Sequence, residues 1–337
     1  MSQRIIFIHG RSFKPARPAL RKLWIAATRQ GIARSAPDKL TTFDRAHKVF
    51  VYYGELSNAF LRSRGKHYDE AADLRDRKAC LRQLSSFREQ DFTKEHYEAL
   101  PGQSSLMELL ADLASGPLYG LGLSERAITT VAPDLCEYWN PDASFGSELR
   151  WSFSEALRRA LNAQDEILVV AHSLGTMIAW DTFWKFSYAG EYRHLRDRYV
   201  ALWITLGSPL GDSTVKAQLK GAQATGPRRF PTNITRWENV AAVDDYISHD
   251  EELANDYHEM LDSGGALERL QDHRIYNLAI RHGRSNPHSS VGYLIHPIVS
   301  RLISGWLRTT PSPHEGRRSA FRDDKDPSHL DGSSTRI

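Results

Sequence analysis

The sequence predicts an α/β protein with a mostly parallel sheet flanked by helices. Three observations carry this prediction. Short apolar runs alternate with segments of helical periodicity along the chain. The first two runs, at 4–8 and 47–53, are separated by one helical segment, as in a βαβ unit with parallel strands. A third run, at 166–170, is mostly aliphatic and leads through a sharp turn into a helix.

The N-terminal part of the chain begins with the βαβ unit. We expect its helix over 18–30, where apolar residues recur at helical spacing, and a polar connection over 31–46. The next predicted strand begins at residue 166. Roughly a hundred residues intervene, far more than one crossover requires. We therefore predict a mostly helical insertion, or cap, over 55–145.

Four segments before the third strand have helical patterns. They are 68–88, 104–114, 133–139 and 147–161. The segment 115–124, SGPLYGLGLS, is apolar but contains three glycines and a proline. Two interpretations stay open for it: a mobile flap over an acyl pocket, or a buried loop.

The C-terminal part of the chain continues the alternation. Further strands are expected at 199–206, 235–243 and 274–280, a basic loop over 216–232, and helices over 250–261 and 290–307. Beyond Arg308 the sequence has almost no apolar residues, so 309–337 is expected to be a disordered tail. The main domain would then span 1–308.

Composition argues against several classes of function. A formal net charge of +3, without a Lys/Arg run and interleaved aromatics, gives no reason to expect nucleic-acid binding. No apolar stretch approaches 18 residues, so no transmembrane segment is expected. No histidine-rich metal motif or glycine-rich phosphate loop occurs, so no metal or cofactor is expected. Cys80 and Cys136 lie far apart, which favours two thiols over a disulfide. With no signal core at the N-terminus, these features predict a cytoplasmic protein.

The third strand and the helix after it have the pattern of a nucleophile elbow, in which a serine stands at the apex of a tight strand–helix turn. The apex residue is Ser173. Small residues two before and two after it, Ala171 and Gly175, let the strand and the helix pass close together. Glycine is usual at both positions, and alanine at the first adds only one methyl group. His172, beside the serine, is expected to be a packed, hydrogen-bonded residue that supports the turn.

A serine hydroxyl needs a base and a group that orients the base. In parallel sheets such groups collect at the carboxyl ends of the strands. Asp244 and Asp245 follow one predicted strand, and His282 and His288 follow the last. We favour Asp245 as the acid, because the acid is usually followed two positions later by an aliphatic residue that returns to the core, here Ile247. We favour His288 as the base, because it lies in a polar loop before the final helix. Asp244 and His282 stay open as alternatives.

Acyl chemistry also needs donors for the oxyanion that develops in the transition state. We expect the backbone N–H groups of Leu174, after the nucleophile, and of Arg11, in the loop after the first strand, to supply them. A role for the Arg11 guanidinium in holding a substrate carboxylate or phosphate is a further hypothesis.

The chain resembles serine α/β-hydrolases of the lipase/esterase type, including bacterial members related to the enzyme that deacylates lipid anchors. The resemblance rests on IIFIHG, VVAHSLGTMIAWDTF, WITLGSPLG, RWENVAAVDDYIS and HSSVGYLIHPIVSRLISGWL. It covers the first fifty residues and most of 130–307. It implies the α/β-hydrolase fold, with Ser173 as nucleophile, Asp245 as acid and His288 as base. The departures are Ala171 and the pair Tyr246-Ile247 after the acid, where Pro-Val is common.

The function expected from these features is hydrolysis of a carboxylic ester, on a small molecule or a lipid, through an acyl-enzyme. An acyltransferase or a peptidase would use the same triad, and a non-catalytic protein of this fold would bind a partner through the insertion. The acyl chain length and the oligomeric state stay open.

Overall fold

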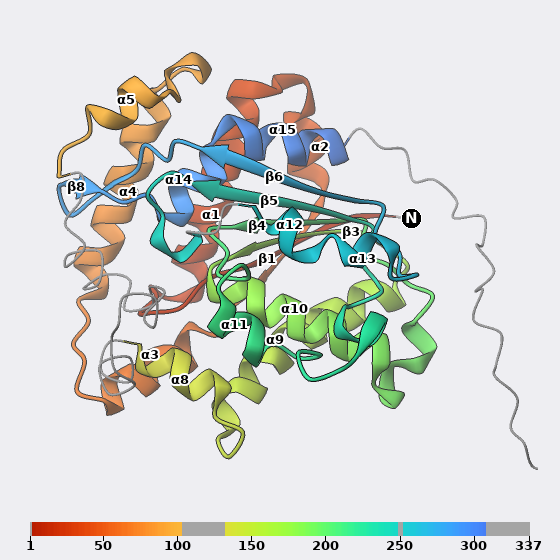
Figure 1. Cartoon of the computed structure of the whole chain (residues 1–337). Helices are drawn as coiled ribbons and strands as arrows, with labels where there is room; N and C mark the ends of the chain where they lie inside the picture. The colour runs from red at the N-terminus through yellow and green to blue at the C-terminus, as the bar shows by residue number, and fades with distance from the viewer. Residues whose placement is uncertain (1, 103–131, 249–251, 308–337) are drawn as a thin grey trace, which may run out of the picture.

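A six-stranded, wholly parallel sheet forms the centre of the protein, as a computed structural model of residues 2–102, 132–248 and 252–307 describes it (Figure 1). Its strand order is β2-β1-β3-β4-β5-β6. The strands are β1 Gln3–Ile8, β2 His47–Val51, β3 Glu166–His172, β4 Leu202–Leu206, β5 Arg236–Ala242 and β6 Arg269–Ile275. The predicted α/β class with a mostly parallel sheet flanked by helices is confirmed.

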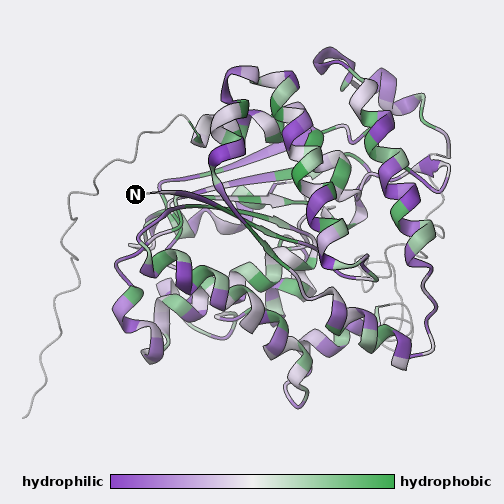
Figure 2. Ribbon diagram, turned by 180° about the vertical axis from the view of Figure 1, so that it is seen from behind, coloured by the Kyte–Doolittle hydropathy of each residue, from purple (hydrophilic) through white to green (hydrophobic). Residues whose placement is uncertain are grey.

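Both faces of the sheet are covered by helices, which explains why the central strands are apolar on both sides. Alternate residues of β1 enter different cores: Ile5 and Phe7 face one, and Ile6 and Ile8 face the other. Figure 2 shows the two helical layers on opposite sides of the sheet. One layer contains α1 Arg17–Ser35, α4 Glu70–Ser86, α14 Ser290–Ile295 and α15 Pro297–Trp306; the other contains α9 Ser144–Asn162 and α10 Leu174–Tyr188.

The strand order reverses beside β1, and this reversal positions the candidate site. The chain passes from β1 outward to β2 and then returns to β3 on the other side of β1. Ile8 is paired in register with Ala171, so the loops that leave β1 and β3 start side by side. In open parallel sheets such a reversal opens a crevice at the carboxyl ends of the strands.

The region predicted as an insertion is helical where the structure describes it. Its helices are α3 Gly54–Ser63, α4, α5 Lys94–Glu98 and α8 Pro133–Trp139. The α4 helix packs against α1 and α14, and α3 packs against α8. The predicted helix 104–114, the segment 115–124 and the tail 309–337 lie outside the described residues. The division into a main domain and a cap stays a prediction.

The last strand of the sheet was placed too late in the sequence. The sheet strand is β6, 269–275, whereas 274–280 was expected. Its sequence, RLQDHRI, is polar because β6 is an edge strand, and charged residues on an edge oppose pairing with another chain. The apolar run after it leads instead into a small hairpin of β7 Ile280–Arg281 and β8 Arg284–Ser285.

Two helical predictions also need correction. The segment 31–46 is not a polar connection, because α1 continues through Gly31 to Ser35 and is followed by a 3-10 turn, Pro37–Lys39, and α2 Leu40–Arg45. Glycine suits position 31 of the helix, because a Cβ there would overlap Ser300 Oγ in the packed helix α15. The closing helix is broken into α14 and α15, since Pro297 disfavours helical geometry at His296.

Smaller elements complete the region between the strands. They are the 3-10 turns Glu89–Asp91, Gly190–Leu195, Gly226–Arg229 and Tyr246–Ser248, and the helices α11 Ser213–Gln218, α12 Leu253–Tyr257 and α13 Glu259–Asp262. The helix expected over 250–261 is thus two short helices in its described part. No helix within the described ranges has the length and apolar character needed to cross a bilayer.

Candidate functional site

Ser173 lies at the turn between β3 and α10, in a backbone conformation that is strained for any residue except glycine. Its φ is 55° and its ψ is −128°. Such a conformation costs on the order of 1–3 kcal/mol and persists only where the surroundings impose it. Here the Ser173 N–H donates to Leu206 O at 3.0 Å, and the Thr176 N–H donates to Ser173 O at 2.8 Å. The turn is therefore held from both the neighbouring strand and the first turn of the helix.

Two glycines allow the loop after β1 to lie directly against this turn. A Cβ on Gly10 would lie 2.7 Å from Ser173 Cβ, and a Cβ on Gly175 would lie 2.7 Å from His9 O. Gly175 therefore provides clearance for the end of β1, whereas a close approach of β3 and α10 was expected to require it. Ala171 is fully buried in β3, where its methyl group is part of the apolar core.

Asp245 follows β5 and His288 follows the β7–β8 hairpin, and the two form a buried hydrogen-bonded pair. His288 Nδ1 lies 3.0 Å from Asp245 Oδ1 and 2.9 Å from Oδ2. The Asp245 side chain is 0% exposed and that of His288 is 11% exposed. Gly207, at the end of β4 with φ 53°, makes room for the pair, since a Cβ there would lie 2.8 Å from Asp245 Oδ2 and 3.0 Å from His288 Nδ1.

The alternative acid and base lie elsewhere. Asp244 accepts a hydrogen bond from the Tyr97 hydroxyl of α5 at 3.0 Å. His282 occupies the turn of the β7–β8 hairpin with φ 52°, and its nearest carboxylate is Asp76, 3.8 Å away. Of the four candidates, the structure brings together only Asp245 and His288.

The Asp245 carboxylate is stabilised by two further donors. The Tyr293 hydroxyl of α14 donates to Oδ2 at 2.6 Å, and the Ile247 N–H donates to Oδ1 at 3.0 Å. Burial alone would raise the pKa of Asp245, but His288, Tyr293 and the Ile247 N–H outweigh burial and hold the pKa below its ordinary value. Asp245 is therefore ionised beside His288. Tyr293 was not predicted as part of the site, because nothing about a tyrosine five residues after the histidine marks a contact with the acid.

His172 supports the loop that carries His288. Its Nε2 lies 3.0 Å from the His288 carbonyl oxygen, and the two rings are 4.6 Å apart. Burial and the neighbouring His288 hold the pKa of His172 well below 6.5, so the ring is neutral and Nε2–H is the donor. A packed, hydrogen-bonded His172 was expected, but its partner is the histidine loop.

The loop after β1 is held by a buried ion pair. Arg11 Nε donates to Asp134 Oδ1 of α8 at 3.0 Å, a second guanidinium nitrogen donates to the same oxygen, and the Ser12 N–H donates to Oδ2 at 3.1 Å. The Arg11 guanidinium is thus engaged by a carboxylate of the protein, which disfavours the hypothesis that it holds a substrate anion.

Lys14 binds the same loop from its other end. Its ammonium group donates to the carbonyls of Arg11, Ser12 and Phe13. Burial lowers the pKa of Lys14 to about 7. Its backbone is in turn clamped by the Asn58 side chain, which accepts from Lys14 N at 2.9 Å and donates to Lys14 O at 2.7 Å.

His9 orients the peptide group that carries the Arg11 N–H. The Tyr53 N–H donates to His9 Nε2 at 3.3 Å, so the ring proton is on Nδ1, which donates to Gly10 O at 2.7 Å. Burial lowers the pKa of His9 to about 3, so this arrangement is kept near neutral pH. Since Gly10 O and the Arg11 N–H belong to one peptide group, the hydrogen bond of His9 restricts the direction of that N–H.

Two groups at the site lack partners within the described part of the chain. Neither Ser173 Oγ nor His288 Nε2 has a hydrogen-bond partner there, and the two are not hydrogen-bonded to each other. Leu174 is the first residue of α10, so its N–H has no acceptor inside the helix. The arrangement offers a serine on a strained turn, a histidine polarised by a buried carboxylate, and backbone donors beside the serine.

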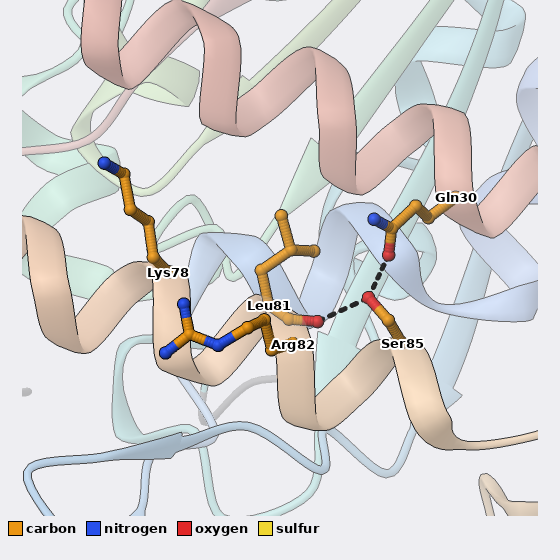
Figure 3. A pocket seen from close by; sticks show the side chains of 5 residues that line it. All are labelled: Gln30, Lys78, Leu81, Arg82 and Ser85. Carbon is orange, nitrogen blue, oxygen red and sulfur yellow. Dashed lines mark hydrogen bonds between the residues drawn. The ribbon is translucent and has the colours of Figure 1, made fainter.

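A separate surface groove of about 320 Å³ lies between α1 and α4 and contains none of these residues (Figure 3). It is lined by Gln30, Lys78, Leu81, Arg82 and Ser85. Over residues 2–102, 132–248 and 252–307, no three His, Cys, Asp or Glu side chains gather as metal ligands would.

Comparison with protein-family models, with curated proteins and with solved structures finds no match to this chain. The fold defines the class: an α/β protein with a parallel six-stranded sheet.

Proposed function

We propose that this protein is a serine hydrolase of the α/β-hydrolase, lipase/esterase type, which cleaves a carboxylic ester through an acyl-enzyme. The observation that carries the proposal is the buried Asp245–His288 pair at the sheet edge where Ser173 occupies a strained turn. A nucleophile follows β3, an acid follows β5 and a base follows the β7–β8 hairpin, a combination that a purely structural turn does not require.

In the proposed reaction, Ser173 Oγ attacks the ester carbonyl carbon while His288 Nε2 accepts the hydroxyl proton. The imidazolium then gives this proton to the leaving alcohol, and Asp245 orients the ring through Nδ1. Water, deprotonated by His288, releases the acyl group and regenerates Ser173. The Ser173–His288 hydrogen bond would form when substrate binds, since such bonds often tighten only in the complex.

The proposed oxyanion donors are the backbone N–H groups of Leu174 and Arg11. Leu174 begins α10, where the helix dipole also favours negative charge. The Arg11 peptide lies next to Ser173 because Gly10 contacts the turn, and His9 restricts its direction. Loss of one such donor typically costs about 3–4 kcal/mol of transition-state stabilisation.

A fluorophosphonate probe tests the proposal, because it labels only an activated serine. We expect the wild-type protein to be labelled and Ser173→Ala to be unlabelled. Ser304→Ala is the matched control, since Ser304 Oγ is buried in α15 without a hydrogen-bond partner in the described part of the chain. Labelling of Ser173→Ala equal to that of the wild type would refute the assignment.

Turnover of nitrophenyl esters of increasing chain length then tests the substrate class. Activity that requires Ser173 supports an ester hydrolase, and the preferred chain length identifies the acyl group. If the wild type is neither labelled nor active on any ester in the series, the proposed function is wrong.

A further inference from the structure

The Asp245 carboxylate is hydrogen-bonded both to His288 and to Tyr293, a residue that does not itself contact the proposed base. Asp245 Oδ2 faces His288 Nδ1 at 2.9 Å and the Tyr293 hydroxyl at 2.6 Å. The same hydroxyl accepts from the Ala242 N–H, at the end of β5, at 2.9 Å. Tyr293 is fully buried, so its hydroxyl exchanges no hydrogen bonds with solvent.

We infer that Tyr293 is a positioning residue for the proposed reaction, which holds the Asp245 carboxylate in place and thereby sets the proton affinity of His288. The inference rests on the proposed function and deepens it. Tyr293 touches neither substrate nor reacting atoms in this assignment; it acts through Asp245.

The direction of the hydrogen bond is determined by the charges. Burial and the neighbouring Asp245 carboxylate raise the pKa of Tyr293 well above 10, so the phenol keeps its proton and donates it to the carboxylate. The Ala242 N–H donates to the Tyr293 oxygen, and the Ser248 hydroxyl also interacts with this oxygen, so the Asp245 carboxylate is the acceptor toward which the Tyr293 proton points.

Donation by Tyr293 changes the proton affinity of the Asp245–His288 pair. With a neutral imidazole the pair carries one negative charge, and with an imidazolium its net charge is zero. A donor to Asp245 stabilises the first form more than the second. Removal of the donor therefore raises the apparent pKa of the pair, so that His288 becomes available as a base only at higher pH.

Other titratable groups face the pair from the surrounding elements. His172 approaches from β3, Asp244 follows the same strand as Asp245, and Tyr97 approaches from α5. Lys14 and Arg77 act on His172 at longer range, but burial and His288 keep its pKa well below 6.5. His172 therefore stays neutral near neutral pH.

The chain contains a matched control for Tyr293. Tyr97 is also a buried tyrosine whose hydroxyl donates to an aspartate, but its acceptor is Asp244, which does not contact His288. Tyr97→Phe and Tyr293→Phe thus remove the same atom beside adjacent aspartates. A merely structural role predicts similar, pH-independent losses from both.

The experiment measures kcat and KM for a nitrophenyl ester from about pH 5 to about pH 10. For Tyr293→Phe we expect the acid limb of kcat/KM to move up by about one pH unit, kcat on the plateau to fall about tenfold, and KM to change little. Tyr97→Phe should leave the acid limb where it is. An acid limb that does not move in Tyr293→Phe, or that moves equally in Tyr97→Phe, overturns the inference.

A second variant covers the case in which Tyr293→Phe fails to fold. Incorporation of 3-fluorotyrosine at position 293 keeps the hydroxyl and makes it a stronger donor, so the acid limb should move to lower pH; an unmoved limb again overturns the inference. The proposed function is tested separately. If the wild type hydrolyses no ester, NMR titration of the His288 ring in the same variants still measures the change in the apparent pKa of the pair. This change is expected even when the protein turns over no ester.

Discussion

Asp134→Ala tests whether a buried charge holds the loop after β1. Asp134 is 1% exposed and Arg11 is 8% exposed. Removal of the carboxylate alone leaves the guanidinium charged in a site that water barely reaches, which typically costs about 3–5 kcal/mol. The Ser12 N–H also loses its acceptor, which adds about 1 kcal/mol. We expect the free energy of unfolding to fall by about 4–6 kcal/mol.

Urea denaturation at pH 7, followed by tryptophan fluorescence, measures this loss. The matched control is Asp44→Ala, which removes the carboxylate of an exposed ion pair with Arg29, whose side chain is 48% exposed. Solvent screens that pair, so the denaturation midpoint should stay unchanged within error. Fluorophosphonate labelling of Asp134→Ala should also be slower, because the loop lies against Ser173.

The pH dependence gives a second readout for Asp134. Burial alone would raise its pKa, but Arg11 and the Ser12 N–H outweigh burial and hold the pKa below 3.8. A carboxyl of this kind contributes stability above its unfolded pKa and loses it as the pH falls through the folded pKa. The difference in stability between wild type and Asp134→Ala should be constant from pH 7 to about 4 and shrink below that.

A double variant separates charge from packing. Arg11→Met combined with Asp134→Leu removes both charges, so it should recover part of the loss seen in Asp134→Ala. If Asp134→Ala costs no more than Asp44→Ala, or if the double variant is as unstable as the single one, the buried ion pair does not hold the loop.

Two further predictions concern the site and the acid limit of stability. Gly207→Ala should lower the rate of fluorophosphonate labelling about 100-fold, because the new Cβ displaces the Asp245–His288 pair; a wild-type rate in a variant with native circular dichroism would contradict this. Burial lowers the pKa of His296 to about 3, so the unfolded chain binds a proton below pH 6.5 that the folded chain does not, and stability falls as the pH falls from 6.5 to 3. His296→Asn keeps an acceptor for the Ile298 N–H and should reduce the fall in the free energy of unfolding by about 1.4 kcal/mol per pH unit. Denaturation curves at pH 7, 6, 5 and 4 measure this free energy, and an equal fall with pH in the wild type and the variant would contradict the prediction.

The sequence was most informative where local patterns and burial agree. The aliphatic run of β3, the small residues beside Ser173 and the helical pattern after it are all local, so the strand, turn and helix were predictable. The pairing of Asp245 with His288 was predictable for a different reason. Asp245 directly follows β5 of the parallel sheet, and His288 lies in the polar loop before the final helix, where the resemblance also places the base. His288 comes only after the β7–β8 hairpin, so the end of β6 did not place it.

The rest depends on contacts that no local pattern encodes. Arg11 and Asp134 are 123 residues apart in the chain, and each sequence neighbourhood is compatible with an exposed side chain. Tyr293 looks like an ordinary core residue of α14 until its hydroxyl is placed beside Asp245. The polar β6 strand was missed because apolar runs were used as the signal for strands, and an edge strand is only partly buried.

The position of β1 has a consequence for synthesis of the chain. Its first residue, Gln3, pairs with Glu166, 163 residues later. At about 5–20 residues per second, a ribosome takes roughly 8–30 s to make the partner strand. β2 pairs with one edge of β1 much earlier, but the other edge stays open throughout this interval. Closure of that edge joins the loop after β1 to the turn at Ser173. The nascent protein therefore carries an apolar, unpaired edge of β1 until β3 is made, and Asp245 and His288 complete the candidate site only later.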